Sequence, residues 1–225
     1  MLKRTSIFVL FLFALFSFLP QTALAVSSVT GHKIIIDAGH GGTDFGSPAC
    51  LDLPEKTANL QIATDLQSLL EADTAIVYMT RASDEKTLSN NDRYTFANST
   101  GGEVLVSVHL NGSSNTSTDG TQGLYGKISK DKAFTQVMHN ALWNGLSSTP
   151  NFTDFGITNF ASGLLLKTTM PATIQETVFI SNTNECNLLK TSGGARQQEI
   201  AQNLYNGLVN WFAQPTPTPK PGKNK

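Results

Sequence analysis

The chain has 225 residues, is 40% hydrophobic and carries a formal net charge of −1 at pH 7. Nucleic-acid-binding proteins normally show a basic patch, and nothing in this sequence suggests one, so we expect no nucleic-acid partner. We find no internal repeats, and the length is enough for one well-buried domain.

The first 25 residues have the pattern of a secretory signal peptide. Lys3 and Arg4 precede an apolar run from Ile7 to Leu19, and the small-residue pattern Ala23–Ala25 follows. The run is short for a membrane span, which needs roughly 20 apolar residues, so we expect cleavage and no stable membrane anchor. Without those two basic residues, 14 basic side chains face 17 acidic ones, which gives the exported chain a charge of −3. Both the periplasm and the extracellular cell wall remain open as destinations.

The other end of the chain differs in composition from the middle. Residues 214–225 are rich in Pro, Thr and Lys, so they cannot bury apolar surface, and we expect an extended or disordered tail. The folded domain is therefore expected over residues 26–213. Its cysteines, Cys50 and Cys186, can pair in an exported protein, but the sequence does not show whether their Cα atoms approach.

Strand and helix patterns alternate through the expected domain. Strand patterns cover Lys33–Asp37, Ala75–Thr80, Val104–Val108, Gly163–Leu166 and Thr173–Ile180. Helical spacing of apolar residues appears in Glu55–Leu70, Ser89–Asn98, Phe134–Leu142 and Ile200–Trp211. This order predicts an α/β domain with a largely parallel sheet, and in such sheets ligands collect at the carboxyl ends of the strands.

A glycine-rich loop follows the first predicted strand, in the stretch Ile34–Gly42, which reads IIIDAGHGG. A dinucleotide site would need a third glycine where Asp44 stands, and an acid there would repel pyrophosphate. The Gly-Lys-Ser/Thr signature of a Walker loop is also absent from the sequence. The glycines are therefore expected to let the backbone pass close to a bound group, because they have no Cβ.

Two histidines occupy equivalent places, each at the end of a predicted strand. His40 follows the first strand and His109 follows Val104–Val108, so one sheet can bring both imidazoles to one point. Either histidine alone would more often be a hydrogen-bonded loop residue, but two with the same placement indicate a metal site. Neutral imidazoles suit Zn²⁺, and a catalytic zinc site often adds one carboxylate and leaves a position for water. His32 and His139 lack this placement and are expected at the surface.

Two acidic residues are candidates for roles at such a site. Glu55 opens the first helix after Pro54, which makes it the best third ligand, although an ordinary first-turn acid is equally consistent. Asn59, one helical turn later, either orients a ligand or is a solvated helix residue. Glu176 lies inside an apolar strand, where a carboxylate needs a partner or a function. It is either a member of an ion pair or the base that takes a proton from metal-bound water.

Taken together, these motifs resemble one family, the zinc-dependent N-acetylmuramoyl-L-alanine amidases of bacterial cell walls (amidase type 3). The similarity extends from Lys33 to about Trp211, with order and spacing preserved. The matching stretches include Ile36–Asp44, Glu55–Leu60, Thr80–Asp84, Leu88, Arg93, Ala97–Asn98, Ser107–Asn111, Leu166–Pro171 and Glu176–Asn182.

The resemblance implies a role for each candidate residue. His40, Glu55 and His109 would be the zinc ligands, and Glu176 the catalytic carboxylate. The fold would be a single phosphorylase/hydrolase-like α/β domain with a twisted, mostly parallel sheet flanked by helices. The reaction would be hydrolysis of the amide between the lactyl group of N-acetylmuramic acid and L-alanine in peptidoglycan, by a chain expected to be monomeric.

The sequence departs from the family pattern at two positions. Val178 stands where the family usually has glycine, and we expect it to crowd the floor of the site and affect rate or substrate. Gly112 stands where alanine is frequent. Two other functions stay open at this point: a zinc peptidase that cleaves stem peptides, and a wall-binding relative without catalysis.

Overall fold

The computed structural model describes residues 29–214. The predicted signal peptide (1–25) lies outside the described residues, as does the predicted tail apart from its first residue, Gln214. None of the described helices combines the length and the apolar character that crossing a bilayer requires.

Six strands and six helices make up the described chain. The strands are β1 (Lys33–Ala38), β2 (Ile76–Met79), β3 (Val104–Asn111), β4 (Gly120–Tyr125), β5 (Thr153–Asn159) and β6 (Ala172–Phe179). The helices are α1 (Glu55–Ala72), α2 (Asn90–Thr100), α3 (Asp131–Leu146), α4 (Gly163–Lys167), α5 (Thr183–Thr191) and α6 (Ala195–Phe212).

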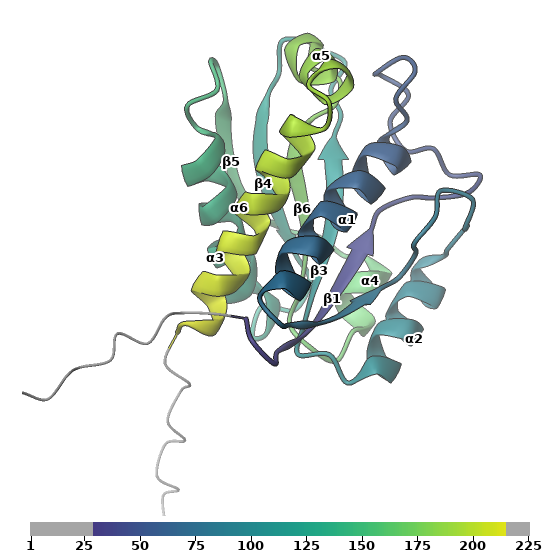
Figure 1. Ribbon diagram of the computed structural model, residues 1–225, viewed down its shortest axis with the longest axis vertical. Coiled ribbons are helices and arrows are strands. Elements are labelled where there is room, and N and C mark those ends of the chain that lie inside the picture. Colours follow the sequence, from purple (N-terminus) through teal and green to yellow (C-terminus); the bar gives the residue numbers. More distant parts are fainter. Residues whose placement is uncertain (1–28, 215–225) are drawn as a thin grey trace, which may run out of the picture.

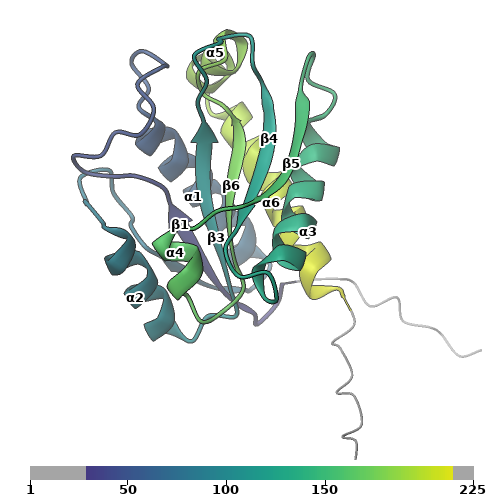
Figure 2. The ribbon, with the colours of Figure 1, turned by 180° about the vertical axis from the view of Figure 1, so that it is seen from behind.

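The strands form one sheet in the order β2-β1-β3-β6-β4-β5. Neighbouring strands are parallel except for β4 and β6, which are antiparallel. Helices α1, α3 and α6 cover one face of the sheet (Figure 1), and the shorter helices α2 and α4 lie on the other face (Figure 2). The predicted α/β class with a mostly parallel central sheet is confirmed.

Alternation along the strands builds a core on each face of the sheet. Ile34 and Ile36 of β1 join the larger cluster under α1, α3 and α6. Ile35, between them in sequence, joins the smaller cluster with Ala97 of α2 and Leu164 of α4. Because successive side chains of a strand point to opposite faces, a continuous apolar run serves both layers.

The segment from Gly163 to Leu166 differs from its prediction as a strand. It forms the short helix α4, whose Leu164 and Leu165 are buried while Leu166 is 45% exposed. A run of four residues fits either a strand or one buried helical turn, and its apolar pattern alone does not separate them. Strands β4 and β5 and helix α5 carried no clear pattern and had not been predicted.

The two histidines expected at the surface are both partly or fully covered. His139 of α3 is 1% exposed, and its Nε2 lies 2.6 Å from Asp154 Oδ1, so its predicted surface position is wrong. The ring of His32 stacks on Phe212 at 3.8 Å between centroids, which leaves it half-buried. In both cases a partner distant in sequence shields the imidazole.

Cys50 and Cys186 form a disulfide, which joins the loop before α1 to helix α5. The two Cα atoms are 5.5 Å apart, although 136 positions separate the residues in sequence. Because a cross-link between distant positions removes much chain freedom from the unfolded state, this bond is expected to stabilise the domain strongly.

Replacement of both cysteines, Cys50→Ser with Cys186→Ser, is expected to lower the free energy of unfolding by about 2–4 kcal/mol. Urea unfolding of the double variant and the oxidised parent would measure this difference. Reduction of the parent should produce the same loss and should leave the double variant unchanged. Equal unfolding midpoints for parent and variant would contradict the expected stabilisation.

Candidate functional site

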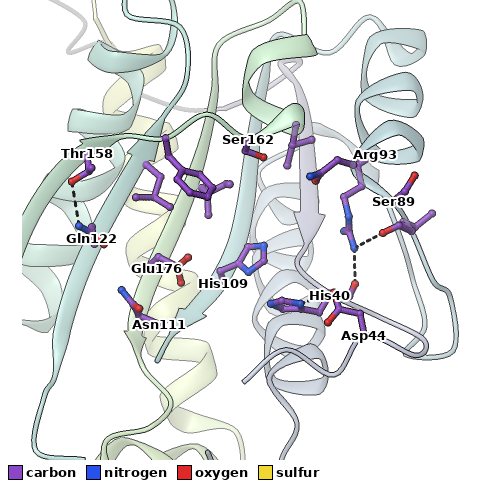
Figure 3. Close-up of a pocket in the computed structure, with 16 residues that line it drawn as sticks. His40, Asp44, Ser89, Arg93, His109, Asn111, Gln122, Thr158, Ser162 and Glu176 are labelled. Carbon is purple, nitrogen blue, oxygen red and sulfur yellow. Dashed lines mark hydrogen bonds and ion pairs between the residues drawn. The ribbon is translucent and has the colours of Figure 1, made fainter. Parts of the chain in front are cut away.

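A cleft of about 760 Å³ lies over the sheet face that carries α2 and α4, and it reaches the carboxyl ends of β1 and β3 (Figure 3). His40 enters it from the loop after β1, His109 from β3 and Glu176 from β6. His109 and Glu176 are register partners on adjacent strands, so their side chains stand side by side. Glu55, at the start of α1, is 3% exposed and contacts both histidines.

Three of the predicted residues form a group that could hold a metal ion. His40 Nε2 lies 3.2 Å from Glu55 Oε1, and His109 Nδ1 lies 3.3 Å from the same oxygen. One ligand atom from each residue can be chosen so that all lie within 4.8 Å of one another. Ligand atoms bound tetrahedrally to zinc are about 3.3 Å apart, given its usual bond lengths, so the two distances to Glu55 Oε1 fit a zinc ion.

The electrostatics of this group favour a cation. Burial alone would raise the pKa of Glu55, but hydrogen bonds and charge from His109 and His40 outweigh it and hold that pKa far below its usual value. Burial opposes protonation of His40, yet Glu55 and Asp44 raise its pKa to about 9. Without a metal, a proton therefore occupies the space between imidazole and carboxylate, and a metal ion can replace it.

Surrounding groups orient the potential ligands. His40 Nδ1 lies 2.8 Å from Asp44 Oδ2, which directs Nε2 of the same ring towards Glu55. Such a carboxylate–histidine contact commonly fixes the ring of a metal-binding histidine. Asn59 donates a hydrogen bond to Glu55 Oε1 at 3.1 Å and is fully buried, so the solvated alternative for Asn59 is wrong. The backbone N–H of Ser47 holds Glu55 Oε2 at 2.8 Å.

Two buried arginines hold the backbone of the loop that carries His40. Arg93 donates to the carbonyls of Ala38 and His40 at 2.9 and 2.7 Å, and it pairs with Asp37 at 2.6 Å (Figure 3 shows its contact with the loop). Arg81 donates to the carbonyls of Ala38 and Gly39 at 2.9 and 2.8 Å. These donors bind carbonyls at the end of β1 and in the loop after it, and they hold His40 at a φ of 60°.

The glycines of the loop allow a close approach between ring and backbone. A Cβ on Gly39 would lie 2.3 Å from Nε2 of His109, which is closer than side chains tolerate. At Gly46 a Cβ would meet both Glu55 and His40, and the φ of Gly46 is 70°. The side chains that pass this close to the glycines of the loop are therefore the potential metal ligands themselves.

Glu176 has the environment of a carboxyl that gains and loses a proton. Burial raises the pKa of Glu176, and the charge of His109 opposes that rise. The salt bridges of the arginines and lysines in residues 29–214 go to other acids, such as Asp37 and Glu185, so an ion pair does not account for Glu176 there. Its side chain faces the cleft beside His109 (Figure 3).

Val178 lies away from the floor of the cleft, so the expectation that it crowds the site is wrong. Its side chain is fully buried in the larger core, under the helices of the opposite face. The pairing of β3 with β6 shifts register between His109 and Asn111, which rotates the strand after Glu176. This irregularity moves Val178 to the other face, contrary to simple alternation.

The sequence motifs assigned no structural role to several residues that hold the site together. Asp44 served only to exclude a dinucleotide site, although it lies four positions after His40 and bonds to its ring. Arg81 and Arg93 occur in the matched stretches, but nothing in the local pattern shows that they bind carbonyls more than 40 positions away. The available signal for Arg81 was its place directly after the predicted strand Ala75–Thr80.

The sequence profile of the N-acetylmuramoyl-L-alanine amidase family matches residues 34–210. The N-acetylmuramoyl-L-alanine amidase CwlM of Bacillus licheniformis is 34% identical over 183 residues, which cover 80% of this chain and 68% of CwlM. The catalytic domain of the amidase CwlV from Bacillus (Paenibacillus) polymyxa var. colistinus superposes with a TM-score of 0.73 at 31% identity, covering 80% of this chain and 98% of that domain. An N-acetylmuramoyl-L-alanine amidase of Clostridium difficile 630 gives the same TM-score at 28% identity, with 81% and 97% covered. The chain belongs to the N-acetylmuramoyl-L-alanine amidase family.

Proposed function

We propose that this chain hydrolyses the amide bond between the lactyl group of N-acetylmuramic acid and L-alanine in peptidoglycan, with zinc bound by His40, Glu55 and His109. The observation that carries the proposal is the convergence of these three ligand atoms beside Glu176 in an open cleft. Membership of the amidase family supports the choice of bond.

The donor set supports zinc as the metal. Two imidazoles and one carboxylate are a common protein ligand set of catalytic zinc sites, and they leave a fourth position for water or substrate. Zn²⁺ in such a site supplies a Lewis acid, which polarises a carbonyl and makes water more acidic. Asp44 and Asn59 hold His40 and Glu55 in the orientation that binding requires.

Glu176 is the proposed general base and general acid. Burial moves the pKa of Glu176 upwards, towards neutral pH, which helps the carboxyl group both to accept and to return a proton. It would take a proton from the attacking water and later donate it to the amine of L-alanine as that amine leaves. Neither cysteine can act as a nucleophile in place of water, because Cys50 and Cys186 are joined in the disulfide.

The proposed place of action is the cell wall, after export. A disulfide forms in oxidising compartments such as the periplasm or the extracellular space, which agrees with the signal-peptide pattern of residues 1–25. The cleft is open to solvent, as a polymeric substrate requires.

Glu176→Gln is expected to keep zinc but to lose hydrolysis of purified sacculi by about 100- to 10,000-fold, because the amide cannot accept a proton. Metal analysis and the rate of release of stem peptides measure the two effects. The matched control is Glu71→Gln, which removes an exposed carboxylate from α1. Wild-type hydrolysis by Glu176→Gln would remove Glu176 from the mechanism.

Mass spectrometry of the same digests separates the amidase from the peptidase alternative. Intact stem peptides with a free L-alanine amine, together with peptide-free glycan, are expected. Stem peptides cut at internal bonds would contradict the proposed function. A chelator should abolish release, and added zinc should restore it.

Gly39→Ala is expected to weaken zinc binding by about tenfold or more, because its Cβ displaces the ring of His109. Titration of the metal-free protein against a competing chelator measures the change. Gly112→Ala is the control, since its Cβ would meet Ser47 at an ordinary distance of 3.4 Å. Equal zinc affinities for the two variants and the parent would show that His109 does not bind the metal.

Zinc binding near pH 7 is expected to release about one proton. His40, with its pKa raised to about 9, is protonated in the metal-free protein, whereas the lowered pKa of Glu55 leaves that group ionised. The affinity for zinc should therefore rise with pH until about pH 9 and then level off. Calorimetry in buffers of different ionisation enthalpy measures the released protons, and Asp44→Asn should reduce their number. Binding without proton release would contradict His40 as a ligand.

A further inference from the structure

We propose that the stem peptide extends from Glu176 across β4 and β5, and that this surface prefers a second peptide residue with an amidated α-carboxyl group, D-isoglutamine, over one with a free carboxylate, D-isoglutamate. The inference rests on the proposed amidase function and assigns the substrate class of the same cleft.

The direction of the peptide follows from the order of the strands. β6 lies between β3 and β4, and Glu176 is the register partner of His109 on one side and of Gln122 on the other. The potential metal ligands are on the β3 side. Glu176 must return a proton to the leaving amine, so L-alanine lies next to it, and from there the cleft continues above β4 to Gln122 and Thr158.

Distances along the sheet place the second residue of the peptide. Neighbouring strands are about 4.8 Å apart, so β4 and β5 lie one and two such steps beyond Glu176. An extended dipeptide spans about 7 Å, which brings the second residue to the region between β4 and β5. Gln122 of β4 and Thr158 of β5 line the cleft in that region.

The chemistry of this region matches an uncharged amide. Gln122 Nε2 donates to Thr158 Oγ1 at 3.2 Å, which holds the two neutral polar groups together (Figure 3). An amide and a hydroxyl can each donate and accept, as a primary carboxamide does. Leu124, Ile174 and Phe160 complete the lining with apolar surface.

The same region lacks a cation that could bind a free carboxylate. Neither β4, with the sequence GTQGLY, nor β5, with TDFGITN, contains a lysine or an arginine. Among the described residues that line the cleft, Arg93 is the one arginine or lysine, and it is 6% exposed and bound to Asp37 and the loop carbonyls. A carboxylate on the second residue would therefore lie on the β4–β5 side of Glu176 without a lysine or arginine to pair with, and amidation removes its repulsion from Glu176.

The test compares two glycan fragments that carry otherwise identical stem peptides, with D-isoglutamine or D-isoglutamate at the second position. Both compete in one reaction with the zinc-loaded protein, and the ratio of kcat/KM is read by mass spectrometry. We expect kcat/KM to be about tenfold or more higher for the amidated peptide, which is the factor that loss of one charged or polar contact produces.

Thr158→Lys adds a cation to this region at an exposed position of β5, one strand away from Gln122. It is expected to reduce the preference to near unity or to reverse it. Gln136→Lys is the matched control, because it adds the same charge at an exposed position of α3, on the opposite face of the sheet, and should leave the ratio unchanged.

Equal consumption of both substrates by the parent would overturn the inference. A ratio that Thr158→Lys leaves unchanged, or that Gln136→Lys changes equally, would overturn it too. In either case the amidase function would stand, because both substrates are cleaved. If neither substrate loses its peptide, the proposed function itself fails, and this inference with it.

Discussion

The site depends on two guanidinium groups buried beneath the loop that follows β1. Arg81 and Arg93 donate to the carbonyls of Ala38, Gly39 and His40, at the end of β1 and in the loop that follows it. A buried charge is tolerated only when it is paired and hydrogen-bonded, and Asp37 meets that condition for Arg93. The whole loop, and the imidazole it carries, is thereby fixed to the sheet rather than left to its own conformational freedom.

The sheet arranges the chemistry along one row of side chains. His109, Glu176 and Gln122 are register partners on three successive strands, so the proposed metal binding, the proposed proton transfer and the proposed peptide recognition follow one another across the cleft. β3 and β6 contribute residues to the larger core, whereas Leu124 of β4 packs against the smaller one. Changes in the proposed peptide-binding region can therefore alter substrate preference without disturbing the potential metal ligand His109, two strands away.

Long periodic segments and strand-end histidines were predictable from sequence, since each depends on local pattern. The four candidate residues come together at one cleft, as the strand order implies. The failures have tertiary causes. Gly163–Lys167 is too short for its period to be read, Val178 is moved by a register shift, and His139 is covered by the edge strand. Neither the disulfide nor the arginine contacts were predictable, because their partners lie tens of residues away.

The stacked rings of His32 and Phe212 bring the beginning and the end of the described fold together at one pole of the domain. The cleft contains His40 and His109, near the carboxyl ends of β1 and β3, whereas His32 precedes the amino end of β1. His32 and Phe212 therefore lie at the end of β1 remote from His40. A partner that contacts the domain at His32 and Phe212 would leave the cleft free for the glycan.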